Sequence, residues 1–147
     1  PSNMPVEIRV TGLDHPAHSG VRGAQPVSLS AVRPRTDRPE LGVAVWFDIL
    51  TIPGTGDLNR FYRETENWIY RNYAPYALVR PEWSKGWGYG SGGAWTDPVM
   101  FRRRVPASFR RRGARQSTWN ADIARLDRLD PYRLFTSPLV RRLMPKV

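Results

Sequence analysis

The 147-residue chain has no cysteine, only two lysines and no long apolar run. Without cysteine it can form no disulfide, no thiolate nucleophile and no cysteine-ligated zinc site, and its redox compartment stays open. No stretch approaches the roughly 18 apolar residues that span a bilayer, and the amino terminus resembles no signal peptide. We therefore expect a soluble chain.

What the chain does have is arginine. Its length suits one domain over residues 1–147, and its hydrophobic content of 40% is typical of a globular fold. The formal net charge is +10, and the excess is almost entirely arginine. Basic domains often bind nucleic acid or anionic surfaces, but an arginine excess can also reflect genomic base composition, so charge alone does not identify a partner.

Three segments have the pattern of β-strands. Residues 5–14 alternate apolar and polar side chains, as a half-buried strand does, and residues 27–34 alternate again. Residues 43–53 are apolar at almost every position, which predicts a central strand covered on both faces. Residues 76–83 return as an extended segment at a sheet edge, since proline cannot donate to a strand ladder.

Two segments have helical periodicity. Apolar side chains repeat at near 3.6 spacing after Thr55, which we expect to cap a helix that reaches Tyr73 and packs on the sheet. A second helix begins at Thr118 or Asn120, with apolar residues on its inner face, and a short turn follows near the carboxyl end. The inner residues of the second helix are predicted to be Ile123, Leu126 and Leu129. This order predicts an α+β fold, with helices on one face of a mainly antiparallel sheet.

Glu7 and Arg9 are the first candidate site residues. Positions i and i+2 of a strand share a face, so the two charged groups can converge. A carboxylate beside a guanidinium can accept a proton while the cation stabilises developing negative charge. A solvated ion pair explains the same spacing.

Asp48 is the third candidate, because it follows Trp46 in the apolar segment 43–53. An unpaired carboxylate there would cost several kcal/mol by rough estimate, so it needs a partner, and Arg9 or Arg80 can supply one. A purely structural ion pair and a role beside a pocket both remain open.

Several other motifs give weaker indications. The glycine run at 86–93 has no G-K-[ST] signature and predicts a mobile loop rather than a phosphate cradle. His15 and His18 lack a third histidine or a cysteine nearby, so we expect no metal site. No serine lies in a G-x-S-x-G context, which leaves hydrolase chemistry unsupported.

The region Arg102–Arg115 supports an alternative function. "FRRR" and "FRRRGAR" place phenylalanines beside arginines, the combination that binds nucleic acid or an anionic surface. No nucleic-acid-binding motif surrounds them, and a solvated surface loop is the simpler interpretation.

The segments "VEIRVTGLD", "VAVWFDILTIPGT", "RPEWSKGWGYG" and "LDPYRLFTSPLVRRLMP" resemble, in order and spacing, the carboxy-terminal part of class II cholesterol oxidases, the vanillyl-alcohol-oxidase type. The resemblance runs from about residue 5 to residue 145. It implies the substrate-binding cap of an oxidase that uses flavin adenine dinucleotide (FAD) and dioxygen to convert a sterol 3-hydroxyl to a ketone. The flavin-binding domain of that family has no counterpart in this chain, so the cap is expected to be inactive alone.

The resemblance also implies residue roles. Arg9 matches the family's arginine that stabilises the substrate oxygen or reduced flavin, Glu7 matches the carboxylate that holds it, and Lys85 matches a lysine near the flavin. Asp48 stands where the family is expected to have asparagine. Aromatic residues and Arg80 complete an expected sterol pocket, namely Trp46, Trp83, Trp87 and Trp95. The expected partners are a sterol and a flavin-binding domain; the location stays open, secretion of a full-length relative included, and binding of an apolar ligand without turnover is a third possibility.

Overall fold

The computed structural model describes residues 5–52, 54–74, 76–85, 96–111 and 118–146. Two strands, β1 (Val6–Gly12) and β2 (Val43–Ile49), pair antiparallel. The helical elements are η1 (Pro16–His18), α1 (Leu58–Asn72), the π-helical turn η3 (Met100–Arg104), α2 (Val105–Ser108), α3 (Thr118–Leu129) and α4 (Pro138–Leu143).

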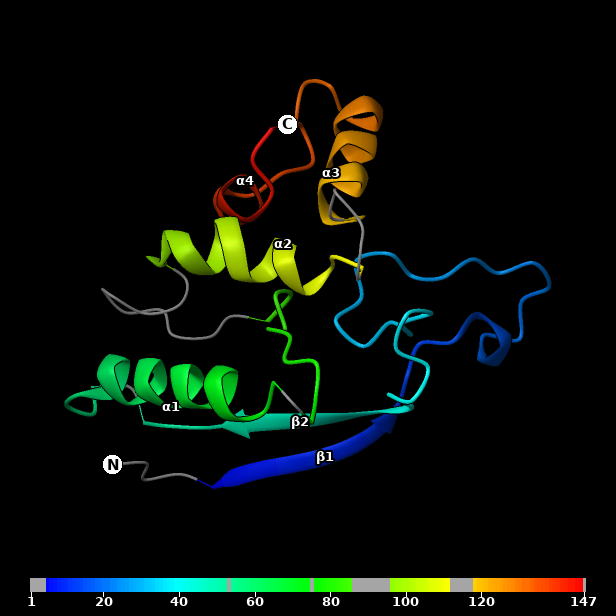
Figure 1. Ribbon diagram of the computed structural model, residues 1–147. Coiled ribbons are helices and arrows are strands. Elements are labelled where there is room, and N and C mark those ends of the chain that lie inside the picture. The colour runs from blue at the N-terminus through cyan, green and yellow to red at the C-terminus, as the bar shows by residue number, and fades with distance from the viewer. Residues whose placement is uncertain (1–4, 53, 75, 86–95, 112–117, 147) are drawn as a thin grey trace.

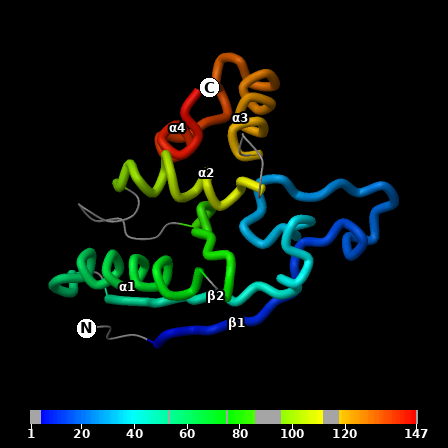
Figure 2. The backbone as a smooth tube through the Cα atoms, in the orientation of Figure 1, coloured from blue at the N-terminus to red at the C-terminus, as the bar shows by residue number. Residues whose placement is uncertain are grey.

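The helices α1 to α4 lie on the β2 side of the sheet, and β1 is the outermost element (Figure 1). The chain starts beside the sheet and ends beside α4, at the opposite end of the molecule (Figure 2). The predicted α+β class is confirmed. None of the helices in the described part of the chain is long and apolar enough to cross a membrane.

The sheet is smaller than the sequence predicts. Residues 27–34 form successive turns, in which the amides of Ser30 and Arg33 donate to carbonyl groups three residues earlier. Residues 76–83 form no strand either, so both strand predictions are wrong. The prediction that β2 is covered on both faces is also wrong, because Val43 is 61% exposed and Val45 51% exposed. Two side chains of residues 27–34 contact the helical part: Leu29 packs against the buried core, and Arg33 donates to the Thr118 hydroxyl at 2.9 Å.

Helix α1 is confirmed, but its predicted cap is not. The Thr55 hydroxyl donates to the carbonyl of Ile52 at 2.7 Å, so it caps no helix. Asp57 occupies the N-cap position with a φ of 61° and makes no side-chain cap. The end of the helix packs against β2 as expected. The ring centre of Tyr73, the C-cap residue of α1, lies 6.3 Å from the ring centre of Phe47 on β2.

The buried core lies in the other half of the molecule. It is formed by Met100, Phe101, Val105, Phe109, Trp119, Ile123, Leu143 and Met144, each at most 6% exposed. Helix α3 is confirmed, and Ile123 is buried as predicted, whereas Leu126 and Leu129 face solvent. These two were predicted to face inward, but the inner face of α3 is instead led by Trp119, one turn before Ile123.

Candidate functional site

A large cavity lies between β2 and α1. Its volume is about 1390 Å³, and residues 77–82 and parts of 97–104 close its remaining sides. That volume exceeds the roughly 300–1000 Å³ usual for small-molecule pockets. The cavity therefore has room for a rigid apolar ligand of several fused rings.

Aliphatic side chains and five aromatic ones form the apolar part of the cavity wall. Tyr62 fixes the start of α1 to β2, because its hydroxyl donates to the Ile49 carbonyl at 2.9 Å and lies 2.8 Å from the Thr51 hydroxyl. Further along the helix, the Tyr70 hydroxyl is buried and has no hydrogen-bond partner among the described residues, and burial raises the pKa of Tyr70. The apolar face predicted for this helix includes Tyr62 but not Tyr70, and the sequence pattern placed neither residue in a cavity.

A charged cluster lies on one face of the sheet. Glu7 and Asp48 are opposite each other in the strand register, as are Arg9 and Trp46, so all four side chains share a face. Arg9 forms an ion pair with Glu7 at 3.3 Å and a close one with Asp48. The hydrogen bond that Arg9 donates to the Asp48 carboxylate, helped by the charge of Glu7, raises the pKa of Arg9. Asp48 thus has one of its two predicted partners, although its side chain is 30% exposed rather than buried.

Lys85 joins this face through Trp46. Its ammonium group lies 5.1 Å from the centre of the Trp46 ring, close enough for a cation–π interaction, and the indole nitrogen donates to the Thr11 hydroxyl at 2.8 Å. Lys85, Trp46 and Asp48 line the cavity. Arg9 is connected to the cavity wall through Asp48, and Glu7 through Arg9.

Arg80 lines the cavity at its junction with the helical core. Its Nη1 atom donates to the carbonyls of Ala31 and Arg33, at 2.7 and 3.1 Å, while its buried Nε and Nη2 atoms have no hydrogen-bond partner. Burial, together with the nearby charges of Arg35 and Arg33, lowers the pKa of Arg80 to about 10. Its guanidinium also stacks 5.9 Å from the Phe109 ring, which ties the cavity wall to the core.

Among the other predicted pocket tryptophans, Trp83 is described by the structure and does not line this cavity. Trp83 packs edge-on against Trp119 at 5.2 Å and donates to the Leu29 carbonyl at 2.6 Å, beside a second hollow of about 240 Å³. Trp87, Trp95 and the glycine run at 86–93 lie outside the described residues.

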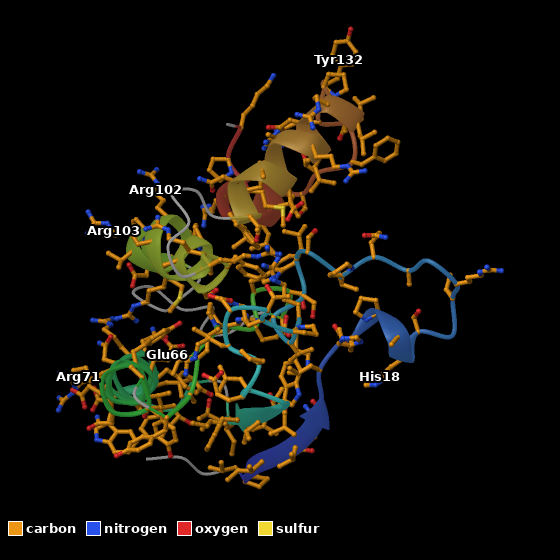
Figure 3. All side chains as sticks on the ribbon, turned by 45° about the vertical axis from the view of Figure 1, so that its right-hand side comes forward. His18, Glu66, Arg71, Arg102, Arg103 and Tyr132 are labelled. Carbon is orange, nitrogen blue, oxygen red and sulfur yellow. The ribbon has the colours of Figure 1, made fainter. Side chains whose placement is uncertain are left out.

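Within the basic region 102–115, residues up to 108 are helical rather than a loop, and residues 112–115 lie outside the described part of the chain. Sequence reasoning missed this helix because the three arginines and Pro106 conceal the helical spacing of Met100, Phe101, Val105 and Phe109. Both phenylalanines are buried, so they cannot stack on bases. Arg102 and Arg103 point outward (Figure 3), and Arg104 stacks 4.6 Å from the Tyr70 ring.

Comparisons with known proteins agree over almost the whole chain. A family model described as "Cholesterol oxidase, substrate-binding" matches residues 1–145. A solved solvent-stable cholesterol oxidase is 53% identical, with a TM-score of 0.87 over 97% of this chain. A histidine-to-alanine mutant of the cholesterol oxidase from Brevibacterium sterolicum is 39% identical, with a TM-score of 0.83 over 98%. The chain spans 27% of the length of each. A search of curated proteins found no match.

Proposed function

The chain belongs to the family of cholesterol oxidase substrate-binding domains, and from this membership we propose that residues 1–147 act as the single cap domain of a sterol oxidase. The cavity between β2 and α1 carries the proposal, because its lining combines aliphatic and aromatic side chains with charged ones, Asp48 and Lys85 among them. A sterol has the same division, with a rigid apolar body and one hydroxyl.

In this proposal the hydroxyl of the sterol faces the charged cluster. Arg9 and Lys85 provide two cations near Asp48 and Trp46, and a preorganised cation stabilises an oxygen that gains negative charge. Glu7 orients Arg9 through their ion pair. The aromatic rings around the cavity hold the apolar body and exclude water.

FAD is the proposed cofactor, held mainly by a domain outside this chain. Two cations on one face of the sheet fit a group that becomes anionic when reduced. When bound, a flavin supplies the site that accepts a hydride from the alcohol, and dioxygen is the proposed final acceptor. The contribution of this chain is to bind the sterol, orient its hydroxyl and supply positive charge.

Asp48 partly neutralises the positive charge of Arg9. Because Arg9 forms ion pairs with both Glu7 and Asp48, two carboxylates offset one guanidinium. We propose that asparagine at this position would strengthen the attraction between Arg9 and a substrate oxygen that gains negative charge. An amide keeps a hydrogen-bond acceptor for Arg9 but removes the negative charge that offsets it.

A chimera tests the proposal. The solvent-stable oxidase is rebuilt with this chain in place of its matching segment, and sterol oxidation is measured by oxygen uptake. We expect turnover, a loss in kcat of about 10²-fold for Arg9→Ala, and a loss for Lys85→Ala. Arg60→Ala is the matched control, because Arg60 also forms an exposed ion pair, with Glu64 at 3.0 Å, but lies outside the cavity. A folded chimera without sterol turnover, or equal activity in all three variants, would contradict the proposal.

A further inference from the structure

The connection between α3 and α4, residues 130–137, presents apolar side chains to solvent at the end of the molecule farthest from the sheet. Tyr132 lies at its tip (Figure 3). Three large apolar residues of the connection and the last residue of α3 are among the most exposed in the described chain: Tyr132 at 83%, Leu134 at 75%, Phe135 at 90% and Leu129 at 77%. We call these four residues the apolar tip.

Polar side chains hold this connection in one shape from the inside. Arg133 takes a φ of 51°, and its guanidinium donates to Asp127 at 2.9 and 2.5 Å and to the Met144 carbonyl at 2.7 Å. The two carboxylate oxygens of Asp130 accept the amides of Leu134 and Phe135, each at 2.9 Å. The polar side chains of this connection therefore form hydrogen bonds within the protein, whereas its large apolar side chains face solvent.

This arrangement is the reverse of an ordinary surface loop. Scattered single apolar residues on a surface need no explanation, but several within one short, internally braced segment indicate an interaction site. A braced segment also loses little conformational entropy on binding, which favours docking. The apolar tip has the properties of a preformed contact surface.

The solved relatives indicate what covers it. This chain matches 97% of its own length to an oxidase of which it spans only 27%, so most of that oxidase lies outside the matched segment. We infer that the apolar tip is a docking surface for the flavin-binding part of such an oxidase. This inference rests on the proposed function and adds to it a second contact, remote from the cavity, between cap and flavin-binding part.

Cysteine labelling tests the inference, because the chain contains no cysteine. Phe135→Cys and Tyr132→Cys are prepared in the isolated chain and in the chimera, and the rate of maleimide labelling of each peptide is followed by mass spectrometry. We expect both positions to label at least about tenfold more slowly in the chimera, where docking covers them. Arg71→Cys is the control: Arg71 is exposed at the end of α1, far from Tyr132 (Figure 3), and its labelling should not change.

Equal rates in the chimera and the isolated chain would overturn the inference. So would slow labelling of the isolated chain that depends on its own concentration, which would assign the apolar tip to a second copy. Slowing only upon addition of phosphatidylserine vesicles would assign it to a bilayer. A chimera that oxidises sterol but leaves the tip reactive refutes this inference alone, whereas a covered tip without turnover refutes only the proposed function. Should the chimera fail to fold, a cysteine at the aligned position of the solvent-stable oxidase gives the same two outcomes.

Discussion

The helical half and the sheet half of this molecule differ in how tightly their side chains are packed. Every fully buried apolar residue of the described chain belongs to the half that contains η3, α2, α3 and α4. In the half formed by β1, β2 and α1, no residue of the strands or of that helix is buried, and a cavity of about 1390 Å³ takes the place of a core. One half therefore contains the packed core, and the other contains the cavity proposed for substrate.

Substituting one phenylalanine in each half gives the largest expected difference between the two halves. Phe109 is 0% exposed in the helical core, whereas Phe47 on β2 is 43% exposed. Phe109→Ala should lower the free energy of unfolding by about 3–5 kcal/mol, because it leaves a cavity in packed surroundings. Phe47→Ala should lower it by only about 1 kcal/mol, since it removes a side chain that is partly in water.

Chemical denaturation followed by tryptophan fluorescence measures both free energies. Similar losses for the two variants would show that the sheet half contributes to folding as much as the helical core, and the division would then be wrong.

A smaller effect is expected at Tyr70, where the two halves meet. Its hydroxyl is buried without a partner, so Tyr70→Phe should raise the free energy of unfolding by about 1 kcal/mol at neutral pH. Because burial raises the pKa of Tyr70 in the folded state, the folded chain keeps the phenolic proton while the unfolded chain loses it above about pH 10. Stability should therefore fall as the pH rises above about 10.

The substitution Tyr70→Phe should reduce that alkaline loss, as measured by denaturant titrations at neutral pH and above pH 10. The lowered pKa of Arg80 acts with the opposite sign and is the same in both proteins, so the difference between them isolates Tyr70. A loss of stability at neutral pH in Tyr70→Phe would mean that the hydroxyl has a favourable contact after all.

The sequence predicted local features well where a periodic pattern matched a single element. Alternation predicted β1 and the shared face of Glu7 and Arg9, and the structure confirms both. The place of Lys85 beside a flavin stays a prediction; the structure shows only that Lys85 lines the cavity. Arg9 was one of the two partners predicted for Asp48, and the structure shows that ion pair. These features depend on neighbours along a strand or on its immediate partner.

Features that depend on distant packing could not be predicted. Residues 27–34 alternate like a strand, yet Arg33 within them bonds to Thr118 at 2.9 Å and so follows the helices rather than a sheet. The helix at η3 and α2 is concealed by arginines on its outer side. The sequence also could not show which tryptophans line the cavity. Trp46 lines it and Trp83 packs against Trp119 of the core, and only tertiary contacts distinguish the two.

Hydrogen exchange of the chimera with and without cholesterol tests the central claim most directly. If the sheet half is the sterol site, cholesterol should slow exchange in β2 and α1, which line the cavity, and leave α3 in the helical core unchanged. Slower exchange confined to the helical half, or no change in β2 and α1 at saturating sterol, would contradict the assignment of the cavity to substrate.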